Sequence, residues 1–231
     1  MVPTRKRFEW LDLLGILTGL SLIAALYGAL VYAPTERIQG PVQRLFYFHV
    51  PSAWVAYLAF FVVFVASIAY LWRRSAFWDR LGRASAEIGV VFTTLAIVTG
   101  SIWARPIWGT WWTWDARLTT TLILWFIYLA YLAVRAYVPD PNRAARYAAI
   151  LGIIGFVDVP IIHMSVVWWR TLHPEPVVVR AEGPALEPPM LAALFLGLGA
   201  MTLLYVYLLV HRVMVEEARD DLQLIRQRLA E

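Results

Sequence analysis

The chain has 231 residues, of which 61% are hydrophobic, 15% aromatic and only 16% charged. A soluble domain is about half apolar and about a quarter charged, so this chain has too little polar surface to cover a water-soluble globule of its size. It contains no cysteine, which excludes disulfides, thiolate metal sites and thiol nucleophiles. Any metal ligand must therefore come from histidine, carboxylate, methionine or the backbone.

Six apolar stretches are each about 20 residues long, which is the length that crosses a bilayer as a helix. Since a backbone in lipid must satisfy its own hydrogen bonds, these stretches must be helical. The spans are expected at residues 11–33, 52–72, 84–103, 119–137, 148–168 and 190–210. The first is too long for a signal peptide and is expected to remain as an anchor. The sequence predicts an all-α, polytopic membrane protein with one six-helix domain over residues 1–231.

The basic residues gather on one side of these spans. With the N-terminus inside, the cytoplasmic segments carry 14 basic residues and the outer loops carry 6. Cytoplasmic loops are enriched in basic residues, so both termini are expected in the cytoplasm. The net charge of +4 then reflects topology, and nucleic acid is not an expected partner. Residues 211–231 form a cytoplasmic tail, expected as a short solvated or surface-lying helix.

Tryptophan gathers on the opposite, outer side. Four of the 12 tryptophans lie within residues 108–114, in the middle of an expected outer loop at residues 104–118. An interfacial segment facing lipid is one explanation. However, adjacent indoles cannot all point to the same lipid depth. We therefore expect the loop to form a flat aromatic platform that stacks on a large planar ligand.

Two of the four histidines lie on the same outer side. His49 precedes the second span, and His173 follows the fifth. Neutral imidazole is a common ligand of haem iron, and two imidazoles can hold the iron from opposite faces while indoles cover the ring. Each histidine taken alone would be an ordinary interfacial residue. His211, at the cytoplasmic end of the last span, is explained by the helix dipole and the lipid headgroups.

Asp158, His163 and Glu87 are further ionisable residues inside the spans. Asp158 and His163 are expected to pair within the bundle, near the backbone groups that Pro160 frees. The alternative is a relay or a second ligand site, because ionisable groups in a span are often functional. Glu87 is expected to reach the interface or to pair with Arg83, one helical turn earlier.

The run GSIWARPIWGTWWTWDARLT at residues 100–119 resembles the tryptophan-rich (WWD) signature of the haem-handling membrane proteins of cytochrome c biogenesis. The length, the six spans, FHVP at residues 48–51 and WWRTLH at residues 168–173 are most similar to the haem exporter protein C (CcmC) family. The resemblance covers nearly the whole chain. Larger relatives, the haem lyase subunit and the synthase of the other maturation system, have more spans. Ala104 departs from the pattern, which has glycine there.

The resemblance implies a function in haem transport. Family members bind haem b without a covalent bond at the periplasmic face of the bacterial inner membrane and deliver it to a periplasmic haem chaperone of the CcmE type. Further implied partners are the membrane and ATPase subunits of an ABC transporter (CcmB and CcmA types) and a small single-span subunit (CcmD type), all within membrane lipid. Handover needs only a competing ligand, so no classical enzyme active site is expected.

The resemblance also implies roles for particular residues. His49 and His173 are the expected axial ligands of the haem iron. The motif residues expected to hold the haem and meet the chaperone are Trp108, Trp111, Trp112, Trp114, Asp115 and Arg117.

Two points about this site stay open in the sequence. The haem propionates can pair with any of Arg44, Arg105, Arg117 or Arg170. Asp115 either orients an indole N–H or the Arg117 side chain, or it caps the fourth helix.

Two other classes of protein also use buried polar groups in membranes. A transmembrane b-type cytochrome subunit of a quinol-oxidising enzyme also has paired histidines and aromatics, but its ligands normally face each other inside the spans. A channel or transporter needs polar residues along its path, and these spans offer few. Haem export is therefore the favoured function.

Overall fold

The computed structural model describes residues 5–169, 171–174, 177–178, 180 and 183–230. In this part of the chain the long elements are α1 (Arg5–Tyr27), α2 (Phe46–Arg73), α3 (Ala76–Trp108), α4 (Ala116–Tyr137), α5 (Pro141–Trp168) and α6 (Pro188–Ala230). A π-helical turn, η1 (Gly28–Tyr32), extends α1, and a 3-10 turn, η2 (Pro41–Leu45), precedes α2. All six long helices are apolar enough to cross a membrane, which confirms the predicted all-α fold with six spans.

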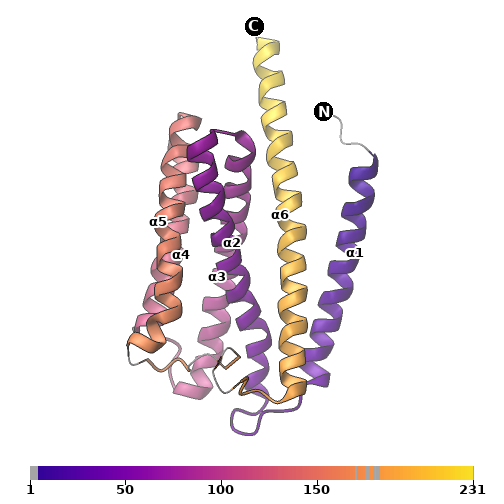
Figure 1. Cartoon of the computed structure of the whole chain (residues 1–231), viewed down its shortest axis with the longest axis vertical. Helices are drawn as coiled ribbons and strands as arrows, with labels where there is room; N and C mark the ends of the chain where they lie inside the picture. The colour runs from indigo at the N-terminus through magenta and orange to yellow at the C-terminus, as the bar shows by residue number, and fades with distance from the viewer. Residues whose placement is uncertain (1–4, 170, 175–176, 179, 181–182, 231) are drawn as a thin grey trace.

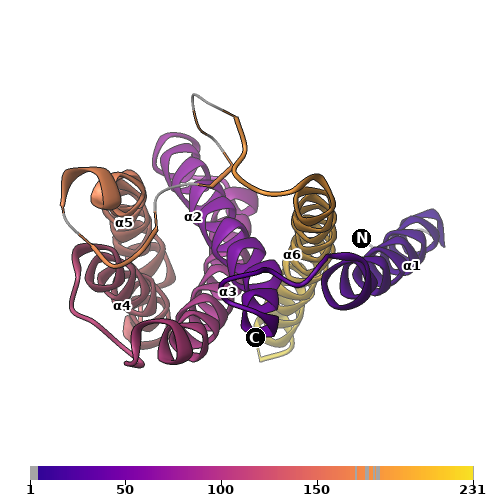
Figure 2. The ribbon, with the colours of Figure 1, turned by 90° about the horizontal axis from the view of Figure 1, so that it is seen from below.

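The helices run side by side along the long axis of the molecule (Figure 1). Seen from one end, α4 and α5 form one pair, α2 and α3 lie in the middle, and α6 separates them from α1 at the far edge (Figure 2). Both termini lie at the same end of the bundle (Figure 1). This end carries the paired Arg83, Arg135 and Arg212 and is called the arginine end. The opposite end carries residues 109–115 and is called the tryptophan end.

Close packing around α2 holds the middle of the bundle together. The Phe60 ring stacks on Tyr128 of α4, with ring centroids 3.7 Å apart. Glycines on the neighbouring helices allow this contact, since a Cβ added to Gly89 would lie 2.4 Å from the Phe60 ring. Likewise, a Cβ added to Gly152 of α5 would lie 2.7 Å from the hydroxyl oxygen of Ser67. Small residues at helix interfaces are typical of membrane bundles, where packing rather than hydrophobic burial drives helix association.

The tryptophan-rich loop is shorter than expected. Helix α3 continues through Pro106 to Trp108, and Gly109, with a left-handed φ of 76°, ends it. Helix α4 begins at Ala116, so the loop covers residues 109–115 rather than 104–118. The expectation was wrong because Pro106 was taken as a helix end.

The C-terminal segment also differs from the expectation. Helix α6 continues from Pro188 to Ala230, so residues 211–230 are not a separate helix but the end of the last span (Figure 1). No glycine or proline follows Gly199, and no residue therefore interrupts the helix.

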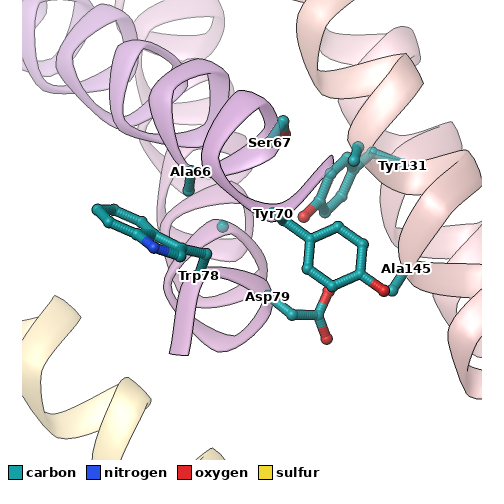
Figure 3. A pocket seen from close by; sticks show the side chains of 9 residues that line it. Ala66, Ser67, Tyr70, Trp78, Asp79, Tyr131 and Ala145 are labelled. Carbon is teal, nitrogen blue, oxygen red and sulfur yellow. The ribbon is translucent and has the colours of Figure 1, made fainter. Parts of the chain in front are cut away.

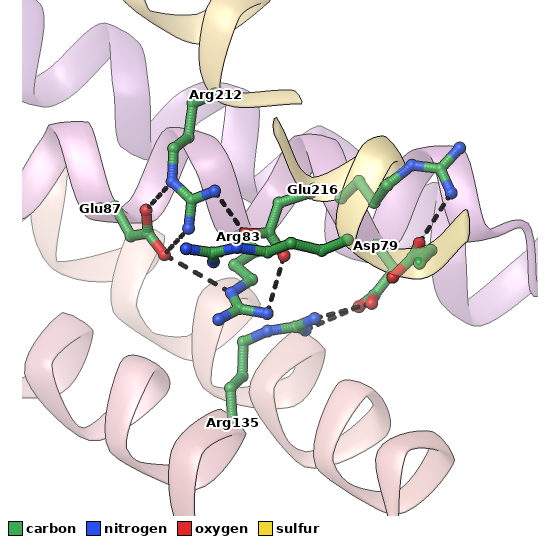
Figure 4. Close-up of polar contacts among 9 residues, drawn as sticks. Asp79, Arg83, Glu87, Arg135, Arg212 and Glu216 are labelled. Atoms are coloured by element: carbon green, nitrogen blue, oxygen red, sulfur yellow. Dashed lines mark hydrogen bonds and ion pairs between the residues drawn. The ribbon is translucent and has the colours of Figure 1, made fainter. Parts of the chain in front are cut away.

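A cluster of ion pairs holds α3, α4 and α6 together at the arginine end (Figure 4). Glu216 of α6 is 3% exposed and accepts hydrogen bonds from Arg83 of α3 and from Arg219, both at 2.8 Å. Glu87 pairs with Arg83 at 3.5 Å, as predicted, and in addition with Arg212 of α6. These pairs tie the part of α6 beyond the apolar span to α3. A similar pair, Arg135 of α4 with both carboxylate oxygens of Asp79, ties α4 to α3.

The predicted pair between Asp158 and His163 is not formed. Five residues place the two side chains about 140° apart around a helix, on different faces of α5. His163 is exposed, whereas the Oδ2 atom of Asp158 is buried and has no hydrogen-bond partner in the described part of the chain. The prediction considered sequence distance but not the helical phase.

We expect Glu216→Gln to lower the free energy of unfolding by about 2 kcal/mol. This value lies between the roughly 0–1 kcal/mol of exposed ion pairs and the roughly 3–5 kcal/mol lost when a buried pair is broken. Denaturant unfolding in detergent, followed by circular dichroism, measures the loss. The matched control is Asp221→Asn, since Asp221 is exposed and has no ion pair among the described residues. Equal losses in the two variants would contradict the role of the cluster.

Candidate functional site

His49 lies in the first turn of α2, slightly inside the helix rather than before it. Its Nδ1 atom is 3.0 Å from the carbonyl oxygen of Ala96 on α3 and 3.2 Å from the hydroxyl oxygen of Thr99. The edge of the Trp103 ring lies against the imidazole, with centroids 5.9 Å apart. A hydrogen bond at Nδ1 leaves Nε2 as the nitrogen that can bind a metal.

His173 lies in the segment between α5 and α6, next to the end of α3. Its Nδ1 is 3.1 Å from the carbonyl oxygen of Pro174, and the Trp108 ring packs edge-on at 6.3 Å between centroids. Burial and the nearby Arg117 guanidinium lower the pKa of His173 to about 4. The imidazole is therefore neutral near pH 7, which is the form that ligates metals.

The two histidines and Arg117 converge at the tryptophan end. The Arg117 guanidinium lies close enough to act electrostatically on both imidazoles, and His49 acts in the same way on His173. The Arg117 guanidinium also acts electrostatically on the hydroxyl of Tyr57 from α2. Within the described residues Arg117 has no carboxylate partner. Segments that lie far apart in the sequence thus bring two imidazoles and a cation to one place.

Two tryptophans of the loop do not lie in one plane, as a flat platform would require. The rings of Trp112 and Trp114 stand edge to face, 5.7 Å apart and at 78° to each other. This arrangement is a favourable one for aromatic pairs. Trp111 is 57% exposed and Trp114 is 76% exposed. The indole nitrogen of Trp112 is buried and, within the described residues, has no acceptor.

Asp115 acts as the N-cap of α4. Its Oδ1 atom accepts hydrogen bonds from the backbone N–H groups of Arg117 at 2.9 Å and Leu118 at 3.1 Å. Its Oδ2 atom accepts one from the hydroxyl of Thr113 at 2.7 Å. Of the two roles left open by the sequence, capping is the one present. The cap fixes the direction in which α4, and with it Arg117, leaves the loop.

The structure separates the four candidate arginines. Arg44 donates to the carbonyl oxygens of Ala29 and Ala33 at the end of η1, and Arg105 donates to the carbonyl of Gly109 at the end of α3. Both guanidinium groups thus complete helix ends. Arg170 lies outside the described residues. Arg117 is the candidate whose charge acts on both histidines.

Sequence reasoning missed several residues around His49. Ala96, Thr99, Gly100 and Trp103 lie three, one and three residues apart, which places them on one face of α3. The signal for them was that spacing together with a glycine in a helix interior. Tyr57, one of many aromatic residues within the second span, carried no signal of its own.

The structure also contains a small cavity at the arginine end, away from the two histidines (Figure 3). It has room for only about 10 Å³ between α2, α3, α4 and α5, beside Tyr70, Asp79 and Tyr131. Ligand pockets typically measure about 300–1,000 Å³, so this space is too small for a large planar molecule. Asp79 is also already occupied by Arg135.

The fold and site together define a class of protein. It is a six-span membrane protein that brings two imidazoles, a cation and an indole N–H without an acceptor among the described residues to one end of the bundle. The described residues contain no group of three His, Asp or Glu side chains that could hold a bare metal ion. Such a set of donors suits a metal already held in a planar, anionic ring.

Comparison with known proteins identifies the family. The family described as Heme exporter protein C matches residues 4–227, and the chain belongs to this family. It is 39% identical to Heme exporter protein C of Haemophilus influenzae over 211 residues, which cover 90% of this chain and 85% of the relative. The protein of that name from Bradyrhizobium diazoefficiens is 44% identical over 76% of this chain and 67% of its own length. Heme exporter protein C of Escherichia coli K12 is 41% identical over 71% of this chain and 67% of its own length.

We expect Asp115→Ala to lower the stability of the protein by about 1 kcal/mol, the usual effect of losing an N-cap. Asp140→Ala is the matched control, because Asp140 caps α5 at the arginine end with the same two backbone bonds. Both losses appear in denaturant unfolding, but only Asp115→Ala should change the near-ultraviolet circular dichroism of the loop tryptophans. Asp115→Asn keeps a cap and should restore both signals. If it fails to do so, the charge rather than the cap is what matters.

Proposed function

We propose that this protein binds haem b at its tryptophan end, on the periplasmic face of the inner membrane, and delivers it to a periplasmic haem chaperone. Membership of the Heme exporter protein C family supports a role in haem export for cytochrome c maturation. Haem is cargo in this proposal, and the protein binds and releases it without converting it. No nucleophile or general base is required.

The observation that carries the proposal is the convergence of His49 and His173 around Arg117. In each histidine Nδ1 faces a backbone carbonyl, so each presents Nε2 as the free ligand. We assign these two Nε2 atoms as the axial ligands of the haem iron. The low pKa of His173 keeps that ligand neutral throughout the physiological pH range.

Arg117 and Trp112 supply donors for the haem propionates. A half-buried guanidinium without a carboxylate partner costs free energy, and a buried indole N–H without an acceptor does so as well. An anionic propionate would satisfy both groups. Arginine offers a carboxylate two parallel hydrogen bonds, which would fix the orientation of the porphyrin. Trp108, next to His173, is assigned to the wall of the site.

The exposed part of the loop is the proposed docking surface for the chaperone. Trp111 and Trp114 expose large aromatic surfaces, and exposed aromatic residues are frequent anchors of protein interfaces. Docking next to the haem would allow a ligand on the chaperone to compete for the iron or the porphyrin. Asp115 contributes by holding the loop against the start of α4.

The surroundings of the protein follow from its charges and its apolar surface. The basic residues at the arginine end favour a cytoplasmic location for that end, and the tryptophan end would then lie in the periplasm. Helix α1 exposes a series of large apolar side chains that suit contact with lipid or with another membrane subunit. We propose the ABC transporter subunits and the small single-span subunit as the partners within the membrane.

The positions of the ligands disfavour the alternative of a quinol-oxidising b-type cytochrome. His49 lies in the first turn of α2 and His173 lies between two helices, so both are at the margin of the bundle. A site at the margin suits transfer to another protein.

We expect His49→Ala and His173→Ala each to lower haem affinity by at least about tenfold, since the loss of even an outer-shell partner of a metal site typically costs about 10–100-fold. Each variant should also lose the low-spin spectrum of bis-imidazole haem. Haem titration and absorption spectra of the purified protein measure both effects. His211→Ala is the control, because His211 is exposed and packs on Tyr207 of its own helix. An unchanged spectrum in both site variants would contradict the ligand assignment.

A photoreactive amino acid in place of Trp114 should cross-link to a periplasmic haem chaperone only when haem is present. The matched control is Trp72, which is 80% exposed at the arginine end and should give no adduct. Mass spectrometry of the adducts locates the contact. Equal adducts from both positions, or none from Trp114 with haem bound, would count against the docking surface.

A further inference from the structure

Ala96, Thr99, Gly100 and Trp103 on one face of α3 lie next to the His49 ring, and we call this face the seat of His49. We propose that Thr99 and Gly100 are positioning residues that hold His49 in the orientation and tautomer in which Nε2 binds the haem iron. The inference rests on the proposed function, in which His49 is an axial ligand, and extends it to two residues that do not touch the haem.

Gly100 provides the space for the ring. A Cβ added at this position would lie 2.9 Å from Cε1 of His49 and 3.3 Å from Nδ1, closer than ordinary van der Waals contact. Glycine inside a helix costs about 1 kcal/mol relative to alanine, and Gly100 does not have the positive φ that favours glycine. The close approach of the imidazole is therefore the structural reason for a glycine here.

Thr99 and Ala96 determine which ring nitrogen carries the proton. The carbonyl of Ala96 can only accept a hydrogen bond. The hydroxyl of Thr99 donates its own proton to the carbonyl of Leu95 at 2.6 Å, so it too acts as an acceptor toward His49. Both neighbours of Nδ1 are thus acceptors. Nδ1 must carry the proton, and Nε2 keeps the lone pair for the metal.

The seat also affects the strength of the iron bond. A hydrogen bond from the distal ring nitrogen to a carbonyl increases the basicity of the ligating nitrogen and fixes the ring plane. Trp103, one turn further along α3, packs edge-on against the same ring and limits its rotation. Gly100, Thr99 and Trp103 therefore restrain the ring in three different ways, by contact, by hydrogen bonding and by packing.

The variants that test the seat are Gly100→Ala, which fills the space, and Thr99→Val, which keeps the shape of the side chain but removes the acceptor. The controls are Gly199→Ala on α6, where no atom lies within 4 Å of the added Cβ, and Thr99→Ser, which retains the hydroxyl. Two readouts apply. Ring-nitrogen NMR of haem-free protein labelled in its four histidines reports the tautomer. Absorption spectra and the reduction potential of the loaded protein report the iron bond.

We expect Gly100→Ala and Thr99→Val to shift the His49 ring-nitrogen resonances, to reduce the low-spin haem fraction and to weaken haem binding by about 10–100-fold. Gly199→Ala and Thr99→Ser should match the unmodified protein in every readout. If Gly100→Ala fails to fold, Thr99→Val and its serine control decide the question.

Unchanged resonances and spectra in Gly100→Ala and Thr99→Val would overturn the inference. The proposed function would still stand in that case, provided that His49→Ala loses the low-spin spectrum. If His49→Ala keeps that spectrum, the assignment of His49 as an axial ligand fails instead, and the role of Thr99 and Gly100 in ligation fails with it.

Discussion

The interior of a bilayer offers no hydrogen-bond partner to a polypeptide backbone, and the structure of this protein follows from that constraint. In the described part of the chain, six long helices satisfy their own backbone groups, and irregular segments lie at the two ends of the bundle (Figure 1). Polar chemistry is therefore concentrated at the ends. One end is fastened by ion pairs among α3, α4 and α6 (Figure 4), and the other carries the histidines and the tryptophan-rich loop.

The two ends of the bundle differ in how their charges are paired. At the arginine end Glu87 and Glu216 are matched by arginines, which leaves a closed structural cluster. At the tryptophan end the cation of Arg117 has no carboxylate partner in the described part of the chain. Under the proposed function, Arg117 and the indole N–H of Trp112, which has no acceptor among the described residues, are the donors that an anionic cargo would pair. The proposed axial ligands also differ, because His49 is seated between two helices while His173 is held by its own short segment.

The sequence predicts the helices well because length and apolar composition determine what can cross a membrane. It predicts the ends less well, because they depend on details of geometry. Pro106 did not end α3, and the spacing from Asp158 to His163 did not place the two side chains on one helix face. The composition of the candidate site was readable from its histidines and tryptophans. The choice of Arg117 among the arginines, and the seat formed by Thr99 and Gly100, depended on contacts between helices that no local pattern shows.

The central claim is that His49 and His173 bind one haem iron between them at the tryptophan end. The most direct measurement is a cryo-electron microscopy map of the haem-loaded protein in lipid nanodiscs. The account predicts density for one porphyrin with its iron between the two Nε2 atoms and its propionates toward Arg117. Haem bound at the arginine end, or with either histidine turned away from the iron, would contradict it.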